Sequence, residues 1–353
     1  MSWLKHGINP TVHFRSFLKE HPSFRTKLRE ARFALWKQKV AFRSRLGRVG
    51  IDPERVLWVD PRWITNIGLG WSGSKLREIG QIVGGDWDLN TMPFEDLNVY
   101  QAFKARFVHG ARWEDTSYYE SIVTQLDLGT RLWGMRDKES LPKRLDELDC
   151  LFEEIREHGY KTKQQLVGDR YSMRTRDEVT VRIGRDGEFL FQDGRHRLAI
   201  AKILGLPKIA VIVTWRHREW YLFRAQILDY AQRYGGRLYQ PITHPDLTDI
   251  PAVHGDTRFE LIRSNIPVKG GTLLDIGANW GYFCHRFEEE GFHCYAVEKS
   301  SRDFYFLNRL RIAGRRRFTA VHASIFEFWE KSEFDVVLAL NIFHHFLKTA
   351  DGY

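Results

Sequence analysis

Four residues in the last third of the chain have the types and spacing that can hold a nucleoside-containing cofactor. They are Asp275, Gly277, Gly281 and Glu298. An apolar run over residues 272–276 is typical of a buried parallel strand, and the glycines then flank a tight turn into a predicted helix over residues 282–290. A predicted strand over residues 292–297 ends at the glutamate, where a carboxylate can bind ribose hydroxyls. The pattern therefore predicts a βαβ unit with a cofactor at its turn.

The acid inside the turn narrows the choice of cofactor. Dinucleotide-binding turns read Gly-x-Gly-x-x-Gly and cradle a pyrophosphate, whereas this turn reads Asp-x-Gly-x-x-x-Gly. A carboxylate here would repel a pyrophosphate but suits a cofactor that carries an ammonium group and a sulfonium. The segment resembles motif I of the class I S-adenosylmethionine-dependent methyltransferases. The resemblance places Glu298 at the ribose diol of S-adenosylmethionine. It places Asp275, Gly277 and Gly281 at the methionine end. Asn279, inside the same turn, is a further expected contact to the cofactor. The alternative is an ordinary βαβ unit with a glycine turn.

The same resemblance assigns residues further along the chain. Ser324 falls where the family contacts the adenine, and Asn341 begins a motif that lies beside the transferred methyl group. His344 or His345 could act as a general base on an acceptor hydroxyl or amine, because an unperturbed histidine titrates near neutrality. The alternative is that one histidine packs against the sheet and the other is solvated.

Class I domains need more strands than residues 255–353 can hold. Further strands are predicted over residues 317–322 and 334–340, and the sequence ends shortly after the second of them. We expect a fragment of a longer protein, or else a domain that is degenerate or completed by a partner. Methyl transfer would then depend on the half of the sheet that is missing.

A second motif lies at a predicted strand-to-helix junction. It consists of Asp193, Gly194, Arg195, His196 and Arg197. The motif follows a predicted hairpin of residues 179–183 and 189–192, and it opens a predicted helix over residues 198–204. Backbone N–H groups at the start of a helix, together with basic side chains, favour the binding of an anion.

The layout of residues 141–214 resembles the ParB/sulfiredoxin superfamily. A helix is predicted over residues 145–156, before the hairpin, and a strand over residues 209–213, after the motif. The resemblance implies that the second motif grips the phosphates of ATP or another nucleotide. The alternative is that Asp193 and the neighbouring arginines form a structural ion-pair cluster at a helix start.

Composition indicates a globular protein with two or three domains. The chain has 353 residues, of which 43% are hydrophobic and 14% aromatic. Its three cysteines have neither metal-ligand nor disulfide-framework spacing, so no metal site is predicted. No apolar run is long enough to span a membrane, and the N-terminus lacks the core of a secretory signal. We therefore expect a cytoplasmic protein.

Much of the formal net charge of +9 lies in a predicted basic helix within residues 13–48. Its apolar positions Phe24, Leu28, Ala31 and Leu35 form one stripe. Such a helix could bind an anionic membrane surface peripherally or meet nucleic acid, or it could present a solvated basic face over a stripe that faces the core. No standard nucleic-acid-reading motif accompanies it, so specific nucleic-acid recognition is not expected.

Together these patterns predict an α/β protein in which a ParB-like α+β domain is followed by a partial Rossmann-like methyltransferase sheet. We expect a helical, aromatic-rich region at residues 1–138, the ParB-like domain at 139–238, a linker at 239–254 and the methyltransferase part at 255–353. The leading hypothesis is an S-adenosylmethionine-dependent methyltransferase with a small-molecule or glycan acceptor, such as a phosphorylated glycan or a lipid-linked precursor. The alternatives are a nucleotide-dependent small-molecule kinase and a nucleotide-gated binding protein without chemistry.

Overall fold

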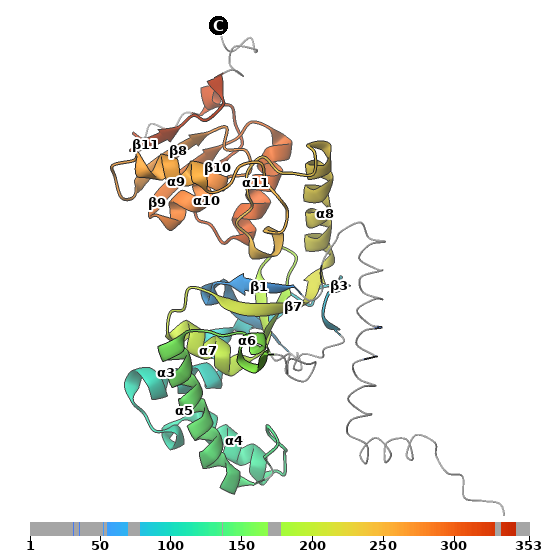
Figure 1. The fold of residues 1–353 in the computed structure, drawn as a ribbon, viewed down its shortest axis with the longest axis vertical. Coiled ribbons are helices and arrows are strands. Elements are labelled where there is room, and N and C mark those ends of the chain that lie inside the picture. Colours follow the sequence, from blue (N-terminus) through green and yellow to red (C-terminus); the bar gives the residue numbers. More distant parts are fainter. Residues whose placement is uncertain are drawn as a thin grey trace, which may run out of the picture.

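A computed structural model describes most of the chain between Arg55 and Phe343, and its fold is α/β with one mixed and one parallel sheet (Figure 1). The described residues are 31, 35, 52, 55–69, 78–135, 137–168, 178–328 and 333–343. Within these ranges, no helix combines the length and the apolar character that crossing a bilayer requires.

The larger sheet is mixed and has the strand order β1-β7-β5-β6-β2-β4, with β3 also paired to β7. Its strands are β1 (Val56–Val59), β2 (Ile64–Gly68), β3 (Gln81–Val83), β4 (Thr91–Pro93), β5 (Val179–Ile183), β6 (Phe189–Asp193) and β7 (Ile209–His217). The predicted hairpin is confirmed, because β5 and β6 are antiparallel and joined by a tight turn. The sheet also unites strands from distant parts of the sequence, since β1 pairs with β7 and β2 with β6. Residues 55–69 and 78–135 therefore share one sheet and one core with residues 178–217.

Six helices accompany this sheet in the part of the chain that the structure describes. They are α3 (Asn98–His109), α4 (Ser117–Asp127), α5 (Leu141–His158), α6 (Lys163–Val167), α7 (Arg195–Ile203) and α8 (Arg218–Arg233). Helices α7 and α8 contact strands of the sheet. Short 3₁₀ turns lie at η1 (Pro61–Trp63), η3 (Phe94–Asp96), η4 (Trp113–Asp115) and η5 (Lys138–Ser140). The helix predicted over residues 145–156 is confirmed as the middle of α5, whose apolar stripe is buried.

The second sheet is parallel and has the order β10-β9-β8-β11. Its strands are β8 (Gly271–Ile276), β9 (Phe292–Val297), β10 (Thr319–Val321) and β11 (Val336–Leu338). Helices α9 (Thr257–Ser264), α10 (Tyr282–Glu289) and α11 (Ser301–Ala313) and the 3₁₀ turn η8 (Ile325–Glu327) accompany it. All four strands that the sequence predicted here are present, with β10 and β11 shorter than expected. β9 and β11 lie on opposite sides of β8, so the strand order reverses at β8. At such a reversal a crevice is expected outside the carboxyl ends of the two strands, here β8 and β11.

We call the larger sheet with its helices, up to residue 233, the first unit, and the part from α9 onward the second or parallel-sheet unit. The segment predicted as a linker, residues 239–254, is packed into the core of the first unit around η7 (Pro245–Leu247). Asp246 is 1% exposed and accepts hydrogen bonds from Arg216 at 2.6 Å and from Trp220 Nε1 at 2.9 Å. Arg55 Nη1 forms an ion pair with Asp249 Oδ1 at 2.7 Å. Of these two pairs only Arg216–Asp246 is buried, and a buried pair is costly to break because each charge would be left without its partner. The connection between the two sheets is therefore fixed in place.

The two units also contact each other through α8 and α11, which lie side by side in Figure 1. Trp280 stacks on Phe306 with ring centroids 4.3 Å apart, and the ring of Tyr230 lies 4.9 Å from that of Trp280. Arg309 adds an ion pair with Asp186 at 2.8 Å. One apolar cluster thus extends from the larger sheet into the second unit, and the two units are packed against each other through it.

Candidate functional site

A cavity of about 630 Å³ lies at the carboxyl ends of the parallel strands. This volume is in the range of small-molecule sites, roughly 300–1,000 Å³. Five of the residues that the sequence assigned to the cofactor line it together: Gly277, Asn279, Glu298, Ser324 and Asn341. The fold thus gathers residues from the ends of four strands at the position where open α/β sheets bind ligands.

The turn after β8 has the backbone geometry that a close ligand requires. Gly277 has φ of 72°, and a Cβ atom added to it would lie 2.6 Å from Cδ1 of Ile342. Asn279 and Asn341 also have positive φ, at 53° and 54°. Such a conformation is uncommon for a residue with a side chain and is best tolerated by asparagine and aspartate. Two left-handed asparagines that line one cavity are consistent with backbone shaped for binding.

Glu298, at the end of β9, is fixed by backbone donors on both oxygens. Oε2 accepts a hydrogen bond from the N–H of Asn279 at 2.9 Å, and Oε1 accepts one from the N–H of Ser300 at 2.7 Å. Burial raises the pKa of this carboxyl, and the two backbone donors act in the opposite direction. Each carboxylate oxygen has a second lone pair, so the group can accept two further hydrogen bonds from a ligand.

Asp275 and Gly281, which the resemblance places at the cofactor, are not among the residues that line the cavity. Asp275 is 3% exposed, and its Oδ2 lies 3.8 Å from the Sγ of Cys284, which donates to it. Burial raises the pKa of Asp275 to about 7. Gly281 is the N-cap residue of α10, and a Cβ atom there would lie 3.3 Å from Cγ of Leu307. Both residues therefore lie behind the turn, where buried side chains such as Cys284 and Leu307 contact them, and they support the turn from there.

Tyr239 lines the same cavity, although sequence reasoning missed it. Its hydroxyl accepts hydrogen bonds from Nδ2 of Asn341 at 2.6 Å and from Nη1 of Arg258 at 3.3 Å. The ring also contacts His254 edge-on, with centroids 4.9 Å apart. No local pattern marks Tyr239, because it belongs to the connecting segment and reaches the cavity only through the tertiary fold.

One wall of the cavity is apolar. It is made by Ala323, Ile325, Phe326, Leu340 and Ile342. Ser324 caps the 3₁₀ turn η8 and shares a capping box with Glu327, which sets the position of this wall. Apolar side chains that line a cavity together with a carboxylate suit a ligand that has a planar apolar part and hydrogen-bond donors.

The second motif is engaged mostly in contacts within the protein. Nε2 of His196 lies 2.7 Å from the hydroxyl of Tyr118, and the imidazole stacks on Phe103 at 5.6 Å. Burial lowers the pKa of His196 to about 3, so this side chain is neutral near pH 7. Nη1 of Arg197 forms an ion pair with Glu178 at 3.2 Å.

The other residues of the motif, Asp193, Gly194 and Arg195, lie at the turn between β6 and α7. Gly194 has φ of 91°, and a Cβ atom there would lie 3.0 Å from Cα of Val179. Oδ1 of Asp193 accepts a hydrogen bond from the N–H of Gly194 at 2.8 Å. Arg195 is exposed at the start of α7. Of the three basic residues, Arg195 is thus the one presented to solvent, and the ion pair of Arg197 is with Glu178.

Two sets of sequence predictions fall outside the described residues. His344 and His345 are one set. The basic helix within residues 13–48 is the other, apart from Ala31 and Leu35.

Comparisons with known proteins give little beyond this geometry. No family model matches the chain, and no curated protein matches it. Among solved structures, the chain is similar to WbdD, as seen in a co-crystal structure with the kinase inhibitor LY294002. The match has a TM-score of 0.30 and 21% sequence identity, and it covers 35% of this chain and 31% of that chain. The matched part is thus the smaller part of both proteins.

Proposed function

We propose that the parallel-sheet unit binds S-adenosylmethionine and serves methyl transfer to a small-molecule or glycan acceptor. The observation that carries this proposal is Glu298, whose carboxylate is held by the N–H of Asn279 in the lining of a cavity of about 630 Å³. A carboxylate at the end of the second strand is the group that binds ribose hydroxyls in open α/β sheets.

The residues that line the cavity fit the parts of this cofactor. Glu298 would hold the ribose diol through its remaining lone pairs. Phe326 and its apolar neighbours would enclose the adenine, and the left-handed turn around Gly277 and Asn279 would face the amino-acid end. When bound, the cofactor supplies an electrophilic methyl group on a sulfonium. The protein itself contributes position, by fixing the carboxylate and the turn before the ligand arrives.

The cationic cofactor also agrees with the charge of the site. Glu298 and Asp303 line the cavity, with Lys299 as the single lysine or arginine among the lining residues. Acidic groups of this kind attract an ammonium and a sulfonium and repel a polyphosphate. The same balance disfavours ATP as the ligand of this cavity.

The direct test is calorimetric titration of the whole chain with S-adenosylmethionine and with S-adenosylhomocysteine. We expect saturable binding of both, and a loss of roughly tenfold or more in affinity for Glu298→Gln, because hydrogen bonds to a charged acceptor contribute about 1.5–3 kcal/mol. Glu260→Gln, on the exposed side of α9, is the matched control. Folded wild-type protein that binds neither ligand, or a Glu298→Gln variant with unchanged affinity, would contradict the proposal.

A further inference from the structure

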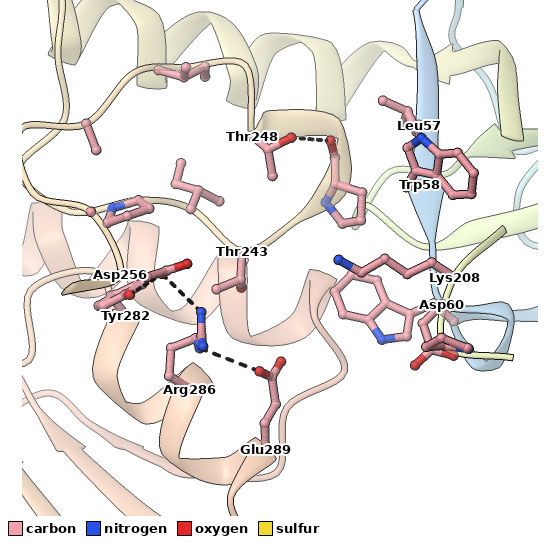
Figure 2. A pocket seen from close by; sticks show the side chains of 18 of the residues that line it. Leu57, Trp58, Asp60, Lys208, Thr243, Thr248, Asp256, Tyr282, Arg286 and Glu289 are labelled. Atoms are coloured by element: carbon pink, nitrogen blue, oxygen red, sulfur yellow. Dashed lines mark hydrogen bonds and ion pairs between the residues drawn. The ribbon is translucent and has the colours of Figure 1, made fainter. Parts of the chain in front are cut away.

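A larger cleft, of about 1000 Å³, lies between the first unit and the parallel-sheet unit (Figure 2). Trp58 and Asp60 from the β1 region and Lys208 before β7 form one wall, and Asp256 and Arg286 belong to the opposite wall. The cleft is distinct from the cofactor cavity, and no residue is common to the two linings.

The basic side chains that line the cleft differ in whether an acidic residue neutralises them. The lysine and arginine side chains in its lining are Arg55, Arg62, Lys208, Arg286 and Arg316. All of the arginines form ion pairs, with Asp249, Asp60, Asp256 and Glu289 respectively. Lys208 forms no ion pair with any residue that the structure describes, and it extends from its wall into the cleft in Figure 2. A single uncompensated cation in a cleft favours a ligand with one anionic group.

Trp58 supplies a large apolar surface beside this cation. Its side chain is 45% exposed although it lines the cleft, and one of its ring contacts is edge-on to Tyr160 at 6.5 Å. Residues Trp58 and Ala210 are paired across β1 and β7, so the tryptophan and Lys208 are close on the same edge of the sheet. An exposed indole ring offers the flat apolar area on which a ring-shaped ligand can stack.

The remaining polar groups of the cleft suit hydroxyls better than further anions. Asp60, Asp256 and Glu289 are carboxylates, and Thr243 and Thr248 add hydroxyl groups. Carboxylates accept hydrogen bonds from sugar hydroxyls but repel a second or third phosphate. A ring with many hydroxyls and one anionic group satisfies the lysine, the tryptophan and the carboxylates together, whereas a nucleoside triphosphate does not.

The cleft also adjoins the cofactor cavity. Tyr239 lines the cavity, His254 lines the cleft, and their rings are in edge-on contact at 4.9 Å. The two linings are therefore in direct contact through this pair of side chains. From these observations we infer that the cleft binds an anionic saccharide, a sugar with one phosphate or carboxylate, through Lys208 and Trp58. Its role as the acceptor rests on the proposed function of the neighbouring cavity, whereas its binding does not.

The test is calorimetry of the whole chain with glucose 1-phosphate and glucuronate as probes of the two anionic groups, and with glucose, inorganic phosphate and ATP for comparison. The wild-type protein binds at least one of the anionic sugars more tightly than glucose or phosphate. Lys208→Gln weakens that binding about tenfold, as loss of a charge-assisted hydrogen bond does, and leaves glucose unaffected. Trp58→Ala weakens every sugar, and Trp58→Phe restores part of the affinity. Lys104→Gln, on the exposed side of α3, is the matched control and changes nothing.

Failure of this inference is distinguishable from failure of the proposed function. S-adenosylhomocysteine affinity stays unchanged in Lys208→Gln and Trp58→Ala, because neither residue lines the cofactor cavity. If S-adenosylhomocysteine binds and neither anionic sugar does, the saccharide assignment is overturned and the cofactor site stands. It is equally overturned if sugar binding survives both variants, or if ATP binds more tightly than the sugars and is lost in Lys208→Gln.

Discussion

The side-chain amide of Asn341 donates a hydrogen bond of 2.6 Å to the hydroxyl oxygen of Tyr239. One residue follows the last described strand, and the other lies at the start of the segment that connects the two sheets. The contact therefore joins two residues that line the cavity of about 630 Å³, and one of them comes from outside the parallel-sheet unit. Because Arg258 also donates to the same oxygen, the tyrosine is held from two directions.

We expect Tyr239→Phe to weaken binding of S-adenosylhomocysteine severalfold. The variant keeps the ring but removes the acceptor of the Asn341 amide, and a hydrogen bond of this kind contributes about 1 kcal/mol. Tyr239→Ala, which also opens the wall, has the larger effect. The measurement is calorimetric titration. Tyr305→Phe is the matched control, because Tyr305 donates to Gln226 at 3.1 Å and does not line the cavity. Equal losses in Tyr239→Phe and Tyr305→Phe would argue against this role.

Local patterns in the sequence were enough for the elements of the parallel sheet. The predicted strand over residues 292–297 coincides with β9, and the predicted helix over residues 282–290 differs from α10 by its last residue. Apolar runs and glycine turns of this kind depend on neighbouring residues, so periodicity is informative about them. The predicted placement of Glu298 beside the glycine turn was likewise a local inference from one βαβ unit.

Contacts between distant residues could not be inferred in this way. Nothing in the sequence around Ile64 indicates that it pairs with Phe189 in one sheet, and a proline-rich stretch gives no sign that Asp246 becomes buried against Arg216. His196 is the clearest example. Its position beside arginines predicts an anion site, but Tyr118 and Phe103 come from another part of the chain and engage its ring in contacts within the protein.

The raised pKa of Asp275 predicts a pH-dependent stability. Burial raises this pKa from its ordinary value of 3.8 to about 7. Between these pH values the folded protein holds a proton that the unfolded chain has released, so the free energy of unfolding decreases as the pH rises. The contribution is complete below pH 3.8 and is lost as the pH passes 7. Asp275→Asn removes this dependence, since the amide carries no charge.

The measurement is the thermal unfolding midpoint of both proteins from pH 4 to pH 8. We expect the midpoint of the wild type to fall relative to that of Asp275→Asn as the pH increases through this range. Asp335→Asn serves as a control in the same sheet, because that carboxylate is bound by Thr272 and its pKa is lowered by the backbone N–H of that residue. Parallel pH profiles for wild type and Asp275→Asn would show that Asp275 is charged in the folded protein.

The buried ion pair of Arg216 with Asp246 predicts that the connecting segment stabilises the first unit. Asp246→Asn leaves a buried guanidinium without its counter-charge, which costs about 3–5 kcal/mol of the free energy of unfolding. Asp229→Asn is the matched control, because its ion pair with Arg233 is on the surface of α8 and such pairs contribute less than about 1 kcal/mol. Urea denaturation followed by circular dichroism measures both. Similar losses for the two variants would mean that Asp246 does not stabilise the connection as its burial implies.

The second motif separates into residues that stabilise the fold and one that can meet a ligand. His196→Ala removes a ring that stacks on Phe103 and leaves the hydroxyl of Tyr118 without its partner, so we expect a loss of about 3 kcal/mol in the free energy of unfolding. Arg195→Ala changes stability by less than about 0.5 kcal/mol, because the side chain is exposed. Urea denaturation gives these values.

Titration with ATP tests the nucleotide prediction independently. If ATP binds at the start of α7, Arg195→Ala lowers the affinity for ATP severalfold at unchanged stability. An unaltered ATP affinity in Arg195→Ala, or no ATP binding by the wild type, would rule out a nucleotide site built on this arginine.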